Sequence, residues 1–526
     1  MRLPDVAEMD LERKVGQLFV MGFDGHEPTD EIRDLITDRE LGNVIYFSRN
    51  VDTPAQVAAT TRELQDLARE SGPGIPLFVA ADQEGGVVSR TDWGTEQPAQ
   101  MTMGAAGDAD LVRAAGAAVG AELSAVGVNF DLTPVLDVNN NPDNPVIGVR
   151  SFGEDPDLVG DLGAAMTEGM QAEGVLACGK HFPGHGDTGT DSHHELPVVG
   201  HDRERLDAVE FAPFRRAIDA GIDSIMTTHV SFPAITGDDA TPATVSRAVQ
   251  TDLLREAFGF DGLLATDGME MDAIAGDMGT PEGCVRALAA GCDLLLVCHT
   301  PEVQHASIDA VLEAVRSGRI EEARVDDAVE RILAAKREYV LGTEAASGER
   351  WEATAARSRE AGRDVAAAGV TVARDRDGHL PLSSERPVHL LGFPGGRASF
   401  AEDDRYESSM VADALSAAGL DVRHHAVETV ADAPEFDDGE QVVAAVYNAA
   451  NEPEQARAVR DLSDADLQFV ALSVRNPYDL REFPDVSTAV VTYDYTPSTL
   501  SVTGELLAGA RGARGRLPVT VPGFEN

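Results

Sequence analysis

Residues 175–197 read VLACGKHFPGHGDTGTDSHHELP. The first four residues form an apolar run that is typical of a buried strand. The part from Lys180 to Pro197 holds four His, two Asp, one Glu and one Lys, and Gly and Pro bend it. Such a polar stretch cannot build a hydrophobic core, so we interpret it as a functional loop that a rigid scaffold presents.

The length and composition of the chain predict a large globular protein. With 526 residues, of which 43% are hydrophobic, two or more domains are expected. No apolar run reaches membrane-spanning length. The first twenty residues lack the charged and apolar regions of a Sec-type signal, so we expect a cytoplasmic protein without a membrane partner.

The charge of the chain is strongly negative. There are 42 basic and 91 acidic residues, which give a net charge of −49, and this surface repels nucleic acid and anionic membranes. Only Lys14, Lys180 and Lys336 are lysines. Scarce lysine with dispersed acids indicates a halophile, and it makes a lysine inside the polar loop a candidate for chemistry.

The four cysteines show no metal or disulfide spacing. Cys178, Cys284, Cys292 and Cys298 lie in or beside apolar runs, without a CxxC pair. We therefore expect buried thiols in a reducing compartment rather than a disulfide framework or a zinc site.

The first 300 residues alternate between apolar runs and helix-length amphipathic segments. The expected strands are 17–23, 43–47, 76–83, 129–138, 175–182, 224–230, 263–269 and 293–299. The clearest expected helices are 54–70, 108–127, 156–174, 203–221 and 246–258. Eight such repeats predict an α/β fold of the (β/α)8 barrel type. A doubly wound open sheet is the alternative, but the near-regular order favours closure.

A second, smaller α/β unit follows the barrel. We expect a catalytic barrel at 1–345, a linker and connecting helix at 346–368, and an open α/β sandwich at 369–526. The expected strands of the sandwich are 370–375, 388–393, 442–448, 467–474 and 488–495. This unit is either a scaffold or a donor of residues to the site.

Polar residues follow the expected barrel strands at their carboxyl ends, where a barrel places its active site. These residues are Asp82, Glu84, Arg90, Asp137, Asn144, Arg150, Lys180, His181, His229 and Asp267. A buried unpaired charge is costly, so the set as a whole predicts a functional rim, and a structural ion pair is the lesser alternative for any single member.

The residue types at this rim favour glycosyl transfer to water. Asp267 is a lone carboxylate at a strand end, and Gly268 allows a ligand to approach it. Asp191 lies two residues before His193, close enough to orient the imidazole. A fixed carboxylate and a His can serve as nucleophile and acid/base, as in hydrolysis through a covalent glycosyl-enzyme.

The rival reading is a metal-dependent hydrolase. Its ligands would come from His181, His185, His193, His194, Asp187 and Asp191. No HxH follows the first strand, no HExxH occurs, and Lys180 would oppose a cation. We therefore expect no metal and no organic cofactor in the reaction.

Four motifs resemble those of glycoside hydrolase family 3, in the expected order. KHFPGHGDTGTDSHHELP (180–197) closely resembles the motif of the family's β-N-acetylglucosaminidase branch. ADQEGGVVSR (81–90), NPVIGVRSFGEDP (144–156) and ATDGMEMDAI (265–274) resemble three further motifs. Weaker similarity continues into the second unit, so the resemblance spans nearly the whole chain.

The resemblance implies a role for each matching residue. Asp267 would be the nucleophile, and His193, oriented by Asp191, the acid/base. The sugar in the −1 subsite would be held by Asp82, Arg90, Arg150, Lys180 and His181. In addition, His185 and Asp187 would shape the loop. The loop-borne dyad makes a contribution from the second unit unnecessary.

The leading hypothesis is a retaining exo-β-N-acetylhexosaminidase that acts on a small glycoside or oligosaccharide. Alternatives with the same mechanism are a β-glucosidase or β-xylosidase and an N-acetylglucosaminide phosphorylase. A non-catalytic sugar-binding protein is the alternative from another class.

Overall fold

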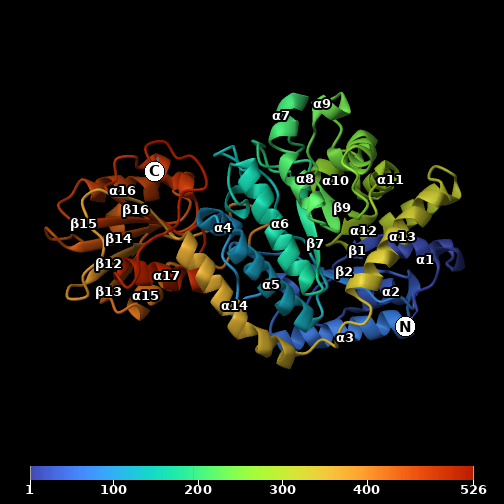
Figure 1. The fold of residues 1–526 in the computed structure, drawn as a ribbon, viewed down its shortest axis with the longest axis horizontal. Coiled ribbons are helices and arrows are strands. Elements are labelled where there is room, and N and C mark those ends of the chain that lie inside the picture. The colour runs from blue at the N-terminus through green and yellow to red at the C-terminus, as the bar shows by residue number, and fades with distance from the viewer. Residues whose placement is uncertain (1, 193–194, 525–526) are drawn as a thin grey trace.

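The computed structural model describes residues 2–192 and 195–524. It shows a closed barrel followed by a separate sheet (Figure 1). Within the described residues, no helix is both long enough and apolar enough to cross a membrane.

Eight parallel strands form the barrel, as predicted. They are β1 (Phe19–Met21), β2 (Asn43–Tyr46), β3 (Phe78–Ala81), β6 (Phe130–Asp131), β7 (Leu176–Phe182), β8 (Ser224–Thr227), β9 (Leu263–Gly268) and β10 (Leu294–Val297). The ring closes where β1 pairs with β10, with Phe19 beside Leu295. Most of their residues are buried, which explains the continuous apolar runs of a sheet covered on both faces.

One strand is shorter than expected. The run 129–138 forms a strand only at β6, because Pro134 has no N–H to donate to a neighbouring strand. Beyond it the chain stays beside β7, where the Leu136 N–H donates to the carbonyl oxygen of Lys180 at 2.6 Å. A hairpin of β4 (Gln83–Gly85) and β5 (Val88–Ser89) follows β3.

Helices cover the outside of the barrel. They are α1 (Leu11–Gln17), α2 (Asp30–Asp38), α3 (Pro54–Glu70), α4 (Gln100–Ala106), α5 (Ala109–Val126), α6 (Pro156–Ala172), α7 (Arg203–Ala208), α8 (Ala212–Asp219), α9 (Pro233–Thr236), the π-helix Ala248–Ala257, α10 (Asp272–Ala275), α11 (Thr280–Ala290), α12 (Pro301–Arg316) and α13 (Glu322–Tyr339). The stretch 203–221, expected as one helix, is two helices, because Pro213 begins α8 and is disfavoured in a helix interior.

The second unit contains six strands rather than the five expected. They are β11 (Thr371–Asp375), β12 (Val388–Gly392), β13 (Val422–Ala426), β14 (Gln441–Val446), β15 (Gln468–Ser473) and β16 (Thr488–Val491), in the order β11-β16-β15-β14-β12-β13. Its helices are α15 (Ser408–Ala417), α16 (Pro453–Ser463) and α17 (Pro497–Leu507). The sequence did not reveal β13 because this edge strand, VRHHA, is largely exposed and lacks an apolar run.

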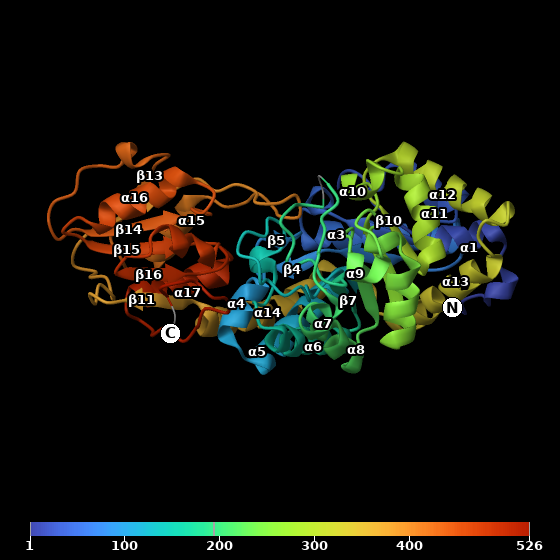
Figure 2. The same cartoon turned by 90° about the horizontal axis from the view of Figure 1, so that it is seen from above.

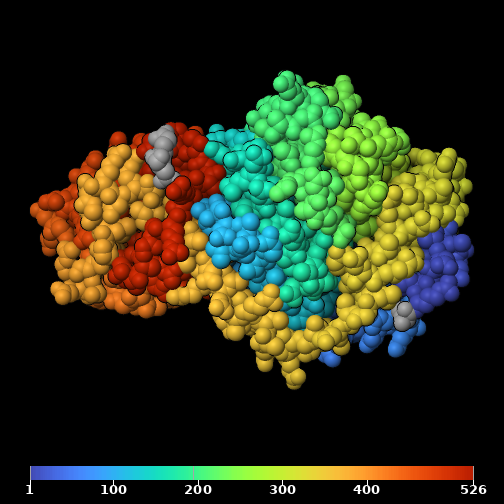
Figure 3. Space-filling model, in the orientation of Figure 1, coloured from blue at the N-terminus to red at the C-terminus, as the bar shows by residue number. Residues whose placement is uncertain are grey.

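Helix α14 (Gly348–Gly369) connects the two units and packs against α5, α4 and α17. Figures 1 and 3 show two lobes that meet beside α4 and α14. In Figure 2, an orange segment reaches from the second lobe toward the barrel. The bounds 1–345, 346–368 and 369–526 stay a prediction.

A buried carboxylate from the second unit caps a barrel helix. Ala99, the N-cap residue of α4, has no side chain that can accept a hydrogen bond. Asp494 supplies the acceptor instead: its Oδ2 accepts from the Ala99 N–H at 2.8 Å and from Thr102 Oγ1 at 2.7 Å. Asp494 thus takes the place of the N3 side chain of a capping box, which accepts from the N-cap N–H, and it joins the two units.

All three lysines are buried. Lys14 is 5% exposed, Lys180 2% and Lys336 0%. Lys336 donates to Gln17 Oε1 and to the Gly42 carbonyl oxygen, both at 2.8 Å, and burial keeps its pKa well below the usual range. The described surface therefore has no exposed lysine. Since Lys14 and Lys336 are buried as well, burial does not distinguish the lysine of the polar loop from the other two.

Replacement of Asp494 by Ala should destabilise the folded protein. The variant removes the acceptor of the Ala99 N–H and one acceptor of the Thr102 hydroxyl, and within the second unit it removes the acceptor of the Thr496 N–H and hydroxyl. Together these losses cost about 3 kcal/mol. Urea unfolding at constant salt should show a lower midpoint, and D494N, which keeps one acceptor oxygen, a smaller shift. The control is D377A, at an exposed Asp of the same unit. Equal midpoints for D494A and D377A would contradict the capping role.

Candidate active site

A cavity of about 620 Å³ lies at the carboxyl ends of the barrel strands. Six of the predicted site residues line it, namely Asp82, Arg90, Arg150, Lys180, His181 and Asp267. The barrel brings them together because they follow different strands that end at the same rim. In the ring of eight strands, β9 and β3 are four places apart, so Asp267 and Asp82 follow strands on opposite sides of the barrel.

Lys180 lies at the centre of a buried ion-pair network. Its Nζ is 2.8 Å from Asp82 Oδ1 and 2.7 Å from Glu84 Oε1. Glu84 also accepts two hydrogen bonds from Arg150, at 2.9 Å from Nε and 2.8 Å from Nη2. The side chains of Lys180, Glu84 and Arg150 are no more than 4% exposed, so the charges compensate one another rather than being solvated.

The network keeps its carboxyl groups ionised. Burial opposes ionisation of Glu84, but Arg150 and Lys180 outweigh burial, and the pKa of Glu84 is lowered. The pKa of Asp82 is lowered in the same way by Lys180 and Arg90 against the effect of burial. These two carboxylates can accept hydrogen bonds from a ligand but do not hold a proton at neutral pH.

The second unit completes this network. Arg90 Nη2 is 3.4 Å from Asp82 Oδ2, and its Nη1 is 3.0 Å from Asp403 Oδ2. Asp403 also accepts from the Ser89 N–H at 3.1 Å and from the Ser48 hydroxyl. Arg397 and residues 400–403 line the cavity. The second unit therefore forms part of the cavity wall. The sequence alone had not decided whether this unit is a scaffold or contributes residues to the site.

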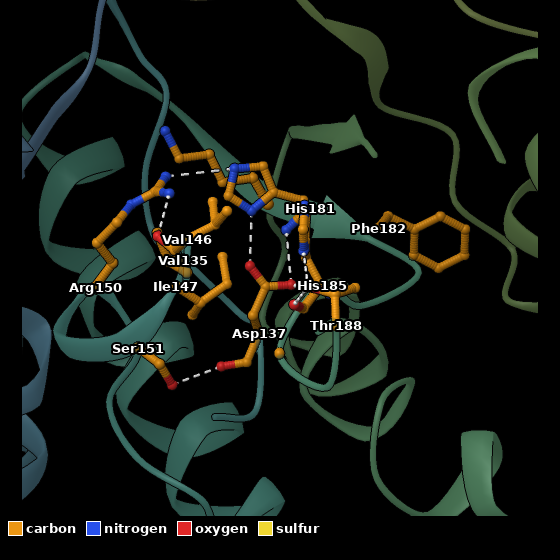
Figure 4. Close-up of polar contacts among 12 residues, drawn as sticks. Val135, Asp137, Val146, Ile147, Arg150, Ser151, His181, Phe182, His185 and Thr188 are labelled. Atoms are coloured by element: carbon orange, nitrogen blue, oxygen red, sulfur yellow. Dashed lines mark hydrogen bonds and ion pairs between the residues drawn. The ribbon is translucent and has the colours of Figure 1, made fainter. Parts of the chain in front are cut away.

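A second group of contacts positions His181 (Figure 4). Asp137 Oδ2 is 2.7 Å from His181 Nδ1, and Asp137 Oδ1 accepts from the His185 N–H at 2.6 Å. His181 Nε2 is 3.4 Å from Arg150 Nη2. The buried carboxylate of Asp137 thus orients the imidazole of His181 in the cavity wall and links it to Arg150.

His185 has a structural position, in agreement with its expected role in shaping the loop. Its ring nitrogens are 2.8 Å from Thr188 Oγ1 and 3.0 Å from Ser192 Oγ. Burial, with a smaller effect of His181, lowers the pKa of His185 to about 4. The ring is therefore neutral at pH 7 and joins both ends of the 185–192 segment.

Asp267 stands at the end of β9 beside a supported backbone. Its Oδ1 accepts from the Gly268 N–H at 2.7 Å, and the Gly268 carbonyl oxygen is 3.0 Å from His229 Nε2. His229 in turn contacts Thr244 Oγ1 at 2.7 Å. These contacts fix the strand end that carries the carboxylate.

Most of the other acids in the wall already accept hydrogen bonds or form ion pairs. Glu270 accepts from three backbone N–H groups, those of residues 298, 299 and 300, at 2.7 to 2.9 Å. Glu402 is paired with Arg475. Asp272 is exposed at the first turn of α10. Among the described wall residues, Asp272 is thus the most exposed carboxyl group.

The predicted acid/base dyad is described only in part. Asp191 is half-buried and does not belong to the described cavity wall, whereas its neighbour Ser192 does. His193 and His194 lie outside the described residues. The sequence analysis noted Glu84 and Asp137 at strand ends without giving them a role in the site. It missed Asp403, because nothing in the stretch AEDDRYE (401–407) distinguishes this acid from its acidic neighbours.

Comparisons with known proteins agree with this geometry. Residues 10–335 match the glycosyl hydrolase family 3 N-terminal domain. A β-N-acetylglucosaminidase/β-glucosidase of Cellulomonas fimi is 31% identical over 98% of this chain and 94% of its own. A β-hexosaminidase A of Pseudoalteromonas piscicida is 29% identical over 93% of this chain and 91% of its own.

A solved structure extends the agreement to the whole fold. The family 3 β-N-acetylglucosaminidase of Paenibacillus sp. FPU-7 is 41% identical, covers 97% of this chain and 99% of its own, and superposes with a TM-score of 0.89. The family match, the barrel and the cavity lead to one conclusion: the chain belongs to glycoside hydrolase family 3 and is a glycoside hydrolase.

Proposed function

We propose that the protein is a retaining exo-β-N-acetylhexosaminidase that releases terminal β-linked N-acetylglucosamine. The observation that carries the proposal is the position of Asp267 across the barrel mouth from the network of Lys180, Asp82 and Glu84. A sugar ring held by this network would present its anomeric carbon to the Asp267 carboxylate. The names of the relatives from Cellulomonas and Paenibacillus support this substrate class.

The charges of the network suit a neutral sugar. The acids Asp82, Glu84 and Asp403 are matched by Lys180, Arg90 and Arg150. The network therefore offers both donors and acceptors to hydroxyl groups without a large net field. Because it is fixed before substrate arrives, little reorganisation is needed on binding.

The reaction would proceed in two displacements. An Asp267 oxygen attacks the anomeric carbon while the leaving oxygen takes a proton from His193. Water then gives a proton back to His193 and attacks the same carbon, which releases Asp267. The acids of the cavity wall support a His as the proton donor. Asp82 and Glu84 are held ionised, and Glu270 accepts hydrogen bonds from backbone N–H groups.

β-Glucosidase activity is the second candidate, because the Cellulomonas relative carries both activities in its name. A panel of nitrophenyl glycosides in molar salt, with and without phosphate, tests both candidates. The N-acetylglucosaminide should be the best substrate, and phosphate should leave its rate unchanged. A higher rate on the glucoside would favour the second candidate, and acceleration by phosphate would favour a phosphorylase.

We further propose a halophilic host and a cytoplasmic location. The burial of all three lysines and the net charge of −49 support the first, because an acidic surface without lysine stays hydrated and soluble at high salt. The four buried free cysteines support a reducing compartment.

Replacement of Asp267 by Asn should abolish hydrolysis of every substrate. The amide has no negative charge with which to form the glycosyl-enzyme, so kcat should fall by at least about 10³-fold. The matched control is D261N, at an exposed Asp just before β9. Turnover of D267N within tenfold of the control would refute the assignment of the nucleophile.

Replacement of His193 by Ala should affect substrates according to their leaving groups. General acid catalysis contributes about 10² to 10⁴-fold, so kcat/KM should fall by this factor on a disaccharide. It should change little on dinitrophenyl glycosides, whose leaving groups need no proton. D272N tests the competing acid of the wall: the leaving-group pattern in D272N rather than in H193A would transfer the role to Asp272.

Replacement of Asp403 by Asn should weaken catalysis from the second unit. The amide loses its charge interaction with Arg90, so Arg90 no longer holds Asp82 in place, and kcat/KM should fall about 10- to 100-fold. The neighbouring exposed Asp404 gives the control D404N. Thermal unfolding of both variants separates the effect from instability. Unchanged kcat/KM in a folded D403N would show that the second unit only covers the cavity.

A further inference from the structure

Three metal-ligating side chains meet beside the polar loop, outside the cavity wall. Asp187 belongs to the loop after β7, His201 precedes α7, and Glu210 lies in the turn between α7 and α8. One ligand atom from each of the three lies within 4.8 Å of the others. His201 Nε2 and Asp187 Oδ2 are in direct contact.

Glu210 is buried and has an unused oxygen. Its side chain is 3% exposed, and no described residue donates a hydrogen bond to its Oε2. The other oxygen, Oε1, has weak contacts with Arg205 Nη2 at 3.3 Å and Asn140 Nδ2 at 3.5 Å. A buried carboxylate oxygen without a donor is costly, and a cation would remove that cost.

A second orphaned acceptor lies beside it. Asn140, whose amide nitrogen contacts Glu210, has an Oδ1 that is also buried and without a described donor. The group around Glu210 therefore contains more acceptor oxygens than donors. The group holds two carboxylates, those of Asp187 and Glu210, against one paired arginine, Arg205, a composition that favours a cation.

The chain approaches closely enough to fix this geometry. Gly184 at the start of the loop lies against Glu210, so that a Cβ at position 184 would be 2.9 Å from the Glu210 Cβ. The break between α7 and α8 places Glu210 in a turn. Asp187, three residues after Gly184, is thereby held close to His201 and Glu210.

We propose that Asp187, His201 and Glu210 bind one Zn²⁺ ion. One imidazole with two carboxylates is a donor set that zinc accepts, whereas Mg²⁺ and Ca²⁺ prefer oxygen ligands alone. A tetrahedral site needs ligand atoms about 3.4 Å apart, so the ion would separate Asp187 from His201 and replace their direct hydrogen bond.

The ion would be structural. None of its three ligands belongs to the described cavity wall, so it leaves the proposed glycosyl transfer free of metal. It would tie the loop that carries Asp191 to the corner between α7 and α8. A site that binds the folded state in this way raises its stability by mass action.

The first test measures zinc uptake by the full, untagged chain. The protein is treated with EDTA in molar KCl, freed of chelator, incubated with ZnCl₂ and desalted. We expect about one zinc per chain by mass spectrometry, together with a higher midpoint of thermal unfolding. A chain that takes up no zinc overturns the proposal.

Matched variants locate the ion. E210Q and H201Q should each bind zinc at least about tenfold more weakly than the wild type. E204Q, at an exposed Glu in the first turn of α7, should bind it unchanged. Circular dichroism reports whether E210Q folds. If it does not, D187N, at a partly exposed residue, gives the same test.

The catalytic cavity provides the competing location. D267N removes a carboxylate from the cavity but none from the proposed site, so it should still bind one zinc. Loss of zinc in D267N, or wild-type binding in E210Q and H201Q, would place the ion elsewhere and refute the site. Replacement of zinc by Co²⁺ gives a visible absorption spectrum that should vanish in the same variants.

Discussion

The contact of Lys180 with Asp82 and Glu84 is the constraint on which the active site depends. Moving a charge from water into a protein costs several kcal/mol, and Lys180 and Glu84 are each only 2% exposed. Each charge is tolerable only if its partners are in place. Lys180 lies on β7, Asp82 and Glu84 follow β3, and Arg150 lies in the chain after β6. The network can therefore form only when the barrel has closed. Closure of the fold and assembly of the ion-pair network in the cavity wall are thus one event.

The same reasoning explains why the second unit contributes to the cavity wall and to its ion pairs. Arg90 lies between Asp82 of the barrel and Asp403 of the second unit, and Asp494 caps α4 across the same boundary. Without the second unit, Arg90 would lose one of its two carboxylate partners, and the first turn of α4 would lose its buried acceptor. The boundary between the two lobes therefore resembles a core more than a hinge, and a loop of the second unit can serve as a wall of the cavity.

The sequence predicted what depends on local pattern. Eight apolar runs marked the barrel strands, and the rule that barrel sites lie at strand ends placed Asp82, Lys180 and Asp267 in one cavity. It did not predict β13, whose residues are largely exposed, or Asp403, whose partner Arg90 is 313 positions away. The scarcity of lysine made Lys180 a candidate for a role in the chemistry, yet Lys14 and Lys336 are buried as well. The scarcity therefore reflects the loss of lysine from the surface.

Binding and proton transfer place opposite demands on the groups of the site. A binding carboxylate must stay ionised, and Lys180, Arg90 and Arg150 achieve this for Asp82 and Glu84 by lowering their pKa values. A general acid needs a pKa near the working pH, which a group held by two cations cannot have. An imidazole, with an ordinary pKa of about 6.5, meets that need without adding a second anion. These opposite demands favour the proposed assignment of the acid/base to the loop, outside the network that we propose holds the sugar.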